Sequence, residues 1–219
     1  MEKPGNTHRV GLELIGAWLG ARSVARGLPA PVADHGGMRV DTGLPNEVRR
    51  YVFAGPVDGI RELAASIDVP HVPIKMCGPA DQLLALLPSG WTLQPPGYLM
   101  TRQTAGDAMP VLPAGYRVDM AIDGQVAAAR IIAGDGALAA SGYAAEHAGV
   151  FIFDRIATDA AHRRRGLGKA LMAALGSTRR SSASQQVLVA TEEGRALYAT
   201  LGWRVLAPYS TAVILAAVD

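Results

Sequence analysis

Residues 158–175 read TDAAHRRRGLGKALMAAL, and they contain the most informative pattern in the chain. An apolar run precedes them, and after Gly166 the residues Leu167, Leu171 and Leu175 recur at helical spacing. The arginines and glycines between these two segments are typical of a turn. We therefore expect a strand, a basic glycine-containing turn and a helix, in this order.

The turn RRRGLGK, residues 163–169, has the features of an anion site. The first N–H groups of a helix lack intrahelical partners and carry partial positive charge. Gly166 and Gly168 place no side chain between an anion and these groups. The arginines and Lys169 add charge-assisted hydrogen bonds to phosphate oxygens. A diphosphate is the ligand that this arrangement predicts; a solvated basic turn or a nucleic-acid patch is the alternative.

Other catalytic and metal signatures are absent from the sequence. The turn lacks the GxxxxGK[ST] of a Walker loop and the GxGxxG of a dinucleotide site, and there is no GxSxG nucleophile elbow. Cys77 has no identifiable activating partner, which favours a small buried residue. Four histidines show no metal-like spacing: His8, His35, His71 and His162. We expect no bound metal ion.

The segments around the turn predict a mixed α/β architecture. Asp-Gly and Gly-Asp-Gly signals separate four apolar runs, which we interpret as consecutive antiparallel strands. The Ala-rich run 125–133 is also compatible with a helix. The expected strands are 116–122, 125–133, 137–147, 150–158, 186–191, 203–206 and 212–216, with a short helix over 192–200.

The first half shows strand and helix alternation as well. We expect a helix over 6–27, a Gly-, Pro- and Asp-rich loop over 29–45, strands at 48–54, 71–76 and 98–101, and helices at 57–67 and 79–88. Residues 103–113 have the composition of a linker. The chain is therefore predicted to divide into an N-terminal α+β region, residues 1–105, and a second domain, residues 106–219.

Arg163-x-x-Gly166-x-Gly168 resembles the R/Q-x-x-G-x-G/A signature of the GNAT superfamily of N-acyltransferases. The preceding FDRIATD, residues 153–159, resembles the splayed central strand of that family, and LYATLGW, residues 197–203, resembles its LYxxxGF element. The resemblance covers roughly residues 114–219. The family often has Asn and Ala at the two positions that are Thr191 and Gly194 in this chain. Thr191 can still cap a helix.

The resemblance implies a fold and an activity. The fold is α/β (α+β), a mixed, mostly antiparallel twisted sheet flanked by helices. The first half resembles the family loosely and has no second diphosphate signature, which is compatible with a degenerate GNAT-like copy. The implied reaction is transfer of an acetyl group from acetyl-CoA, as co-substrate, to a primary amine of a small molecule or peptide. The amine would attack the thioester directly in a ternary complex. A non-catalytic CoA-binding regulatory module of the same fold is the alternative function.

The resemblance also implies the residues of the site. Ile156 and Thr158 would offer main-chain groups to the pantetheine arm, and the turn would hold the pyrophosphate through its N–H groups. Tyr198 would be the general acid near the leaving sulfur, unless it is a core tyrosine. The expected cofactor-binding residues are Ile156, Ala157, Thr158, Arg163, Arg164, Arg165, Gly166, Leu167, Gly168, Lys169, Thr191 and Tyr198.

The general base is less well defined by the sequence. An ammonium substrate must lose a proton before it attacks, so a carboxylate, a histidine or a water chain is needed. Glu146, His147 and Asp154 lie on or beside strands that are expected to enter the site. Glu146 and Asp154 are the catalytic candidates beside Tyr198, and Asp154 is structural if it simply pairs with neighbours such as Arg155.

The amino-acid composition argues against several classes of binding partner. Hydrophobic residues make up 49% and charged residues 18% of the 219, as in ordinary globular proteins. A net charge of +2 and an aromatic content of 5% argue against a dedicated nucleic-acid binder. No apolar window is long enough to span a bilayer, and the start of the chain lacks a secretory signal. A single cysteine fits a cytoplasmic protein, and a homodimer is left open.

Overall fold

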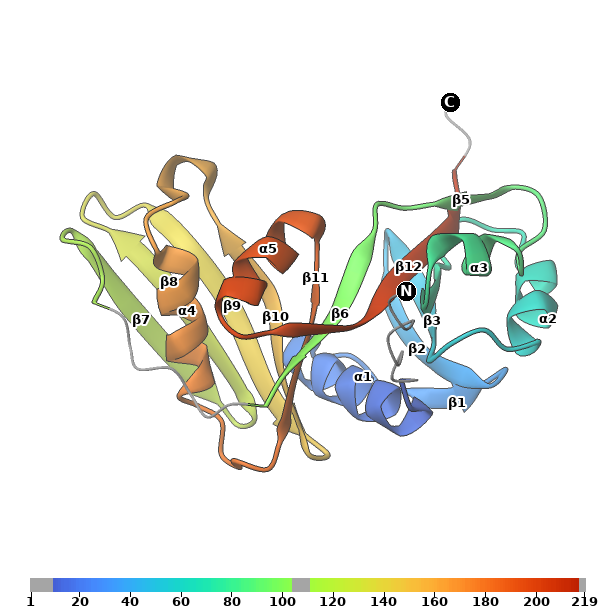
Figure 1. Cartoon of the computed structure of the whole chain (residues 1–219), viewed down its shortest axis with the longest axis horizontal. Helices are drawn as coiled ribbons and strands as arrows, with labels where there is room; N and C mark the ends of the chain where they lie inside the picture. The colour runs from blue at the N-terminus through green and yellow to red at the C-terminus, as the bar shows by residue number, and fades with distance from the viewer. Residues whose placement is uncertain (1–9, 104–110, 217–219) are drawn as a thin grey trace, which may run out of the picture.

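The computed structural model describes residues 10–103 and 111–216, which form helices packed around one 12-stranded sheet (Figure 1). The elements of the first half are α1 (Leu12–Arg26), β1 (Val32–Asp34), β2 (Gly37–Leu44), β3 (Glu47–Phe53), α2 (Gly59–Ser66), β4 (Ile74–Cys77), α3 (Ala80–Leu84), β5 (Trp91–Leu93) and β6 (Gly97–Arg102). Those of the second half are β7 (Tyr116–Asp123), β8 (Val126–Ala133), β9 (Leu138–His147), β10 (Val150–Thr158), η1 (Ala160–His162), α4 (Leu167–Gly176), β11 (Gln185–Ala190), α5 (Glu192–Thr200) and β12 (Arg204–Ile214).

The sheet is mixed and mostly antiparallel, as the sequence predicted. Its strand order is β1-β2-β3-β4-β12-β6-β11-β10-β9-β8-β7, with β5 paired to β12 beside this path. Two pairs are parallel, β3 with β4 and β10 with β11. Parallel neighbours need a crossover connection, and α2 and α4 provide one for each pair.

The two halves exchange their last strands. β6 of the first half pairs with β11 of the second, and β12 of the second half pairs with β4 of the first. β6 and β12 pair with each other and run across the middle of the molecule, between its two lobes (Figure 1). Each half therefore repeats a hairpin, a helix, a parallel strand, a second helix and a crossing strand. The first half thus shares this order of elements with the second half, and its identity as a degenerate GNAT-like copy stays a prediction.

The predicted division at residues 105 and 106 lies in the segment 104–110, outside the described residues. The expected linker 103–113 falls largely on the same segment. The assignment of two domains with these bounds therefore stays a prediction. The exchanged strands mean that the two halves share one continuous sheet.

Helices cover both faces of the second half of the sheet. Phe151 packs in a cluster with Leu171 and other residues of α4, whereas its neighbour Ile152 packs in a second cluster with Trp18 and Leu19 of α1. Successive residues of a strand point to opposite faces, so the continuous apolar run in β10 serves both helices. A third cluster lies beneath α2 and α3 in the first half.

Most predicted elements are present, and the Ala-rich run is the strand β8. The loop predicted over 29–45 is wrong, because β1 and β2 form a hairpin there around His35 and Gly36. Ion pairs of Asp41 with Arg39 and Arg49 on one face of the β2–β3 pair support these strands despite their Gly and Asp content. The two final strands are one strand, β12, with an irregularity after Val205. β5 was not predicted.

Candidate functional site

The site begins where β10 separates from β11. The two strands pair only through residues 150–152 against 185–187. Beyond this point the register of β10 with β9 is irregular between Asp154 and Ala157, and Arg155 has a left-handed φ of 53°. This bulge turns β10 away from β11, as the family resemblance implied, and leaves an opening between the strands.

The basic turn leads from this strand into α4. Gly166 caps the helix with φ of 75° and no side-chain hydrogen bond, and the first turn of α4 carries no acidic residue. α5 differs, because the Thr191 hydroxyl accepts a hydrogen bond from Gly194 N at 3.2 Å. The first N–H groups of α4 thus lack a protein cap. This arrangement fits a bound diphosphate.

A cavity of about 430 Å³ lies between this turn and α5. Gly168 and Leu197 both line it, and a Cβ built at Gly168 would be 3.2 Å from Leu197 Cδ2. The lining contains eleven of the twelve predicted cofactor-binding residues, all except Arg165. The Arg165 side chain instead donates hydrogen bonds to Tyr116 Oη at 2.9 Å and to Ala161 O at 3.3 Å.

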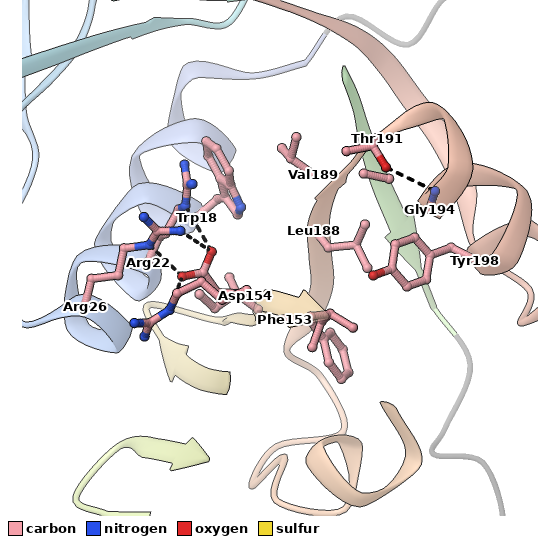
Figure 2. A pocket seen from close by; sticks show the side chains of 14 residues that line it. Trp18, Arg22, Arg26, Phe153, Asp154, Leu188, Val189, Thr191, Gly194 and Tyr198 are labelled. Carbon is pink, nitrogen blue, oxygen red and sulfur yellow. Dashed lines mark hydrogen bonds and ion pairs between the residues drawn. The ribbon is translucent and has the colours of Figure 1, made fainter. Parts of the chain in front are cut away.

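A second cavity of about 270 Å³ continues from the first. The two share Ile156, Thr191, Gly194 and Tyr198, so together they form one groove that runs between β10 and β11. Figure 2 shows this second part, with α1 on one side and α5 on the other. Its far wall is formed by Trp18, Arg22 and Arg26 of α1 together with Asp154 and Arg155 of β10.

Tyr198 lies at the junction of the two cavities and is 7% exposed. Its ring packs against Trp203, with the ring centroids 6.1 Å apart, and against Gly194, where a Cβ would lie 3.3 Å from Tyr198 Cε2. Burial raises the pKa of Tyr198 to about 12. Among residues 10–103 and 111–216, no group accepts a hydrogen bond from this hydroxyl. The hydroxyl is therefore protonated at neutral pH and available as a donor in the groove.

Asp154 is held by three arginines. Arg26 donates from Nε to Oδ2 at 2.6 Å and from Nη2 to Oδ1 at 2.9 Å, and Arg22 Nε donates to Oδ1 at 3.3 Å. Arg155 Nε lies 3.4 Å from Oδ2. Burial alone would raise the pKa of Asp154, but the Arg26 hydrogen bonds and the three positive charges lower it overall. Both carboxylate oxygens are thus engaged, and the group is a weak proton acceptor.

Glu146 lies outside the lining of both cavities. Its carboxylate accepts hydrogen bonds from Arg180 N at 2.6 Å, Ser181 N at 3.1 Å and Ser184 Oγ. Burial opposes ionisation, yet these bonds and the Arg180 charge hold the pKa of Glu146 below its usual value. The geometry gives Glu146 a structural task, which is to fix the loop between α4 and β11. His147 also lies outside the groove lining and packs beside Gly20 of α1.

The sequence interpretation missed the part of the groove that α1 supplies. Trp18, Arg22 and Arg26 line the cavity, although the first helix was expected only to pack on the body of the protein. Their four-residue spacing was a usable signal, because residues at i, i+4 and i+8 lie on one face of a helix. A helix face that only packs against the core carries apolar side chains, whereas this face combines a tryptophan with two arginines.

The equivalent turn of the first half cannot hold a diphosphate in the same way. Residues 54–58, between β3 and α2, contain no basic residue. The β1–β2 turn covers the start of α2 so closely that a Cβ on Gly59 would lie 2.1 Å from the His35 carbonyl oxygen. The start of α2 thus lacks both the positive charge and the open space found at the start of α4.

Within the described residues, no group of three or more His, Cys, Asp or Glu side chains is arranged to hold a metal ion. No helix among these residues is long and apolar enough to cross a membrane. Cys77 is buried, as the sequence indicated, and burial raises the pKa of its thiol to about 12.

Comparison with known proteins finds a family match within the second half. The model of the acetyltransferase (GNAT) domain matches residues 121–205. A comparison with curated proteins found no match. A GCN5-related N-acetyltransferase from Kribbella flavida is similar in structure, with a TM-score of 0.67 at 17% identity over 96% of this chain and 97% of its own.

Two other solved structures extend the comparison. A GCN5-related N-acetyltransferase-like protein from Streptococcus suis has a TM-score of 0.57 at 14% identity, covering 81% of this chain and 83% of its own. A tandem GNAT protein from the clavulanic acid biosynthesis pathway has a TM-score of 0.53 at 15% identity, covering 98% and 91%. The residues matched by the domain model contain the splayed strand, the basic turn and α4. The second half of this chain therefore contains the region that is similar to the GNAT acetyltransferase domain, and the whole chain has the GNAT fold.

Proposed function

We propose that this protein transfers an acetyl group from acetyl-CoA to a primary amine of a small molecule or peptide. The uncapped N-terminus of α4 is the observation that carries the proposal, because it opens on a groove that continues past Tyr198. The N–H groups from Gly166 to Lys169 would hold the pyrophosphate, assisted by the positive charges of Arg163 and Arg164. The pantetheine arm would then lie along Ile156 to Thr158 of β10.

The reaction needs no acyl-enzyme intermediate. The amine nitrogen attacks the thioester carbonyl carbon, the carbon–sulfur bond breaks, and the sulfur leaves as a thiolate. Tyr198 donates its hydroxyl proton to this sulfur, and the resulting tyrosinate recovers a proton from the acylated nitrogen through water. One proton thus moves from the nitrogen to the sulfur. The position of Tyr198 at the junction of the two cavities supports this role.

Water in the groove is the proposed acceptor for the first proton of an ammonium substrate. Asp154 was a candidate for this task, but four contacts from three arginines occupy its oxygens and favour its ionised form. Glu146 faces the 180–184 loop. We assign both carboxylates to positioning, and the amine either arrives neutral or loses its proton to water.

Initial-rate kinetics of the full chain test the proposal. Acetyl-CoA is supplied with a panel of primary amines, and the free thiol released is measured with a chromogenic disulfide. Thiol release that needs both substrates, with intersecting double-reciprocal lines, is the expected result. Parallel lines would point to an acyl-enzyme and overturn the direct transfer. Tight CoA binding without transfer to any amine of the panel would instead favour a non-catalytic CoA-binding module.

A further inference from the structure

The far end of the groove is strongly basic, although the whole chain is almost neutral. Three arginines and one aspartate line the 270 Å³ cavity: Arg22, Arg26, Arg155 and Asp154. These side chains leave an excess of two positive charges, equal to the net charge of +2 of the entire chain. Figure 2 shows the cluster across the cavity from Tyr198. A ligand that reaches this wall therefore meets a positive surface.

The three arginines are not equally engaged. Arg26 makes two hydrogen bonds to Asp154, and Arg155 donates from Nη2 to Ala25 O at 2.7 Å while its guanidinium lies 3.7 Å from the Tyr143 ring centroid. Arg22 contacts Asp154 through Nε alone, at 3.3 Å. Within the described residues, its two terminal nitrogens have no hydrogen-bond partner. Arg22 thus lines the cavity and has two terminal nitrogens that are not used within the described residues.

The guanidinium of Arg22 is also held in place. Its Cζ lies 5.4 Å from the centroid of the Trp18 ring, in a cation–π contact. Trp18 is itself packed edge-on against Tyr209, with ring centroids 5.8 Å apart. An arginine whose Nε and face are both fixed loses little conformational freedom when its terminal nitrogens bind a ligand.

A second layer of basic groups lies behind this wall. Arg50 is 3% exposed, pairs with Glu47 and has no partner for its Nε, and Lys75 lies 3.6 Å from the same glutamate. Burial and the charges of Arg22 and Arg26 lower the pKa of Arg50. Burial, with the charges of Arg22 and Arg50, lowers the pKa of Lys75 to about 8. Glu47 and Asp154 do not balance the charges of the basic groups, so this part of the molecule stays positive. A bound anion would reduce the repulsion between these basic groups.

We infer that the acceptor substrate is a small primary amine that carries a carboxylate, and that Arg22 binds this carboxylate. The inference rests on the proposed function, because it names the class of amine that enters the same groove. A planar guanidinium with two free terminal nitrogens matches a carboxylate in geometry. Two excess positive charges disfavour polyamines and other cationic acceptors at this wall. The volume of 270 Å³ is small for a ligand pocket, which favours an amino-acid-sized acceptor.

Binding without turnover tests the inference separately from catalysis. The full chain is first saturated with CoA. Thermal shifts are then measured with amino acids and with their matched carboxamides. Each ligand is added up to about 10 mM, a range that detects millimolar dissociation constants. At least one amino acid is expected to bind about tenfold or more tightly than its carboxamide, the value of one lost charge-assisted hydrogen bond. Equal affinity within every pair, or no binding by any amino acid, would overturn the inference.

Variants identify the residue responsible. Arg22→Gln should remove the preference for the carboxylate by weakening the amino acid about tenfold while leaving the carboxamide unchanged. Arg22→Lys should keep part of the preference, because it keeps the charge but loses the planar pair of donors. Arg61→Gln, an exposed arginine on α2, is the matched control and should keep the full preference. CoA affinity, measured for each variant, reports whether the groove is intact.

The outcomes separate the two proposals. Carboxylate-selective binding that depends on Arg22, without acetyl transfer, would sustain the inferred ligand class and refute the enzymatic activity. Transfer to neutral or cationic amines in preference to amino acids would sustain the activity and refute the inferred class. A carboxylate preference that survives Arg22→Gln unchanged would refute the role of Arg22.

Discussion

Arg26 and Asp154, 128 residues apart in the sequence, form a two-point ion pair between α1 and β10. Nε and Nη2 of the arginine each donate to a different carboxylate oxygen, at 2.6 and 2.9 Å. Asp154 is 8% exposed, so the protein rather than water must stabilise its charge. The pair joins the first half to the wall of the groove and keeps Arg22 in a position to act as a donor.

Replacing Arg26 by glutamine should destabilise the fold. The change removes two of the four contacts to a buried carboxylate, and such a loss typically costs about 3 kcal/mol. Because Arg22 and Arg155 remain, we expect the free energy of unfolding, measured in urea, to fall by about 2–3 kcal/mol. Arg61→Gln is the control and should change it by less than about 0.5 kcal/mol. An Arg26→Gln change as small as that of the control would mean that the pair is dispensable.

Acid should weaken this same contact. The pKa of Asp154 in the folded chain lies below its ordinary value of 3.8, so the stabilisation is complete above that value and disappears as pH falls through the folded pKa. The unfolding free energies of the wild type and of Asp154→Asn should differ by a constant amount above about pH 5 and converge below about pH 4. A difference that grows in acid would contradict the direction assigned to the pKa.

A side chain at Gly168 should obstruct the cofactor part of the groove. A Cβ at this position would lie 3.2 Å from Leu197 Cδ2 and 3.8 Å from Thr158 Oγ1, so the branches of a valine would project among the lining residues. Gly168→Val should weaken acetyl-CoA binding about tenfold or more, as measured by titration calorimetry. Gly176→Ala at the other end of α4 is the control, because its Cβ meets only Phe153 Cζ at 3.8 Å. Equal affinity of both variants would argue against the predicted site.

Removal of the Tyr198 hydroxyl should slow the reaction without loosening the cofactor. Tyr198→Phe keeps the ring that packs on Trp203 and removes the proton donor, so kcat should fall about tenfold to a hundredfold. Its dissociation constant for acetyl-CoA should stay within about twofold of that of the wild type. Tyr51→Phe, a buried change in the first half, controls for a general effect on the fold. An unchanged kcat would exclude Tyr198 as the acid.

Glu146→Gln should affect stability and spare catalysis. Arg180 N donates to one carboxylate oxygen, and Ser181 N and Ser184 Oγ donate to the other. A glutamine amide has only one acceptor oxygen, so at least one of these donors loses its partner, which costs about 1–3 kcal/mol in unfolding free energy. The kcat at a temperature where the variant is folded should match that of the wild type. A kcat that falls by more than about a hundredfold, with loss of its acidic pH limb, would restore Glu146 as the general base.

The grouping of the residues around the basic turn was predictable because it is largely local in sequence. The end of β10, the turn around Gly166 and the helix α4 follow one another directly, and eleven of the predicted residues line one cavity. The hairpin β1–β2 was missed because Gly and Asp disfavour strands, and only pairing with β3 and the ion pairs of Asp41 outweigh that preference. A local pattern cannot report the energy of a partner strand.

By itself the sequence determined the strand, the basic turn and the helix, since backbone conformation and helix-end electrostatics depend on neighbouring residues. The tertiary structure alone decided that β6 and β12 cross between the halves and that α1 closes the far end of the groove. It decided as well that Asp154 is bound by arginines, because contacts across 128 residues form only when the packed sheet brings those groups within hydrogen-bond distance.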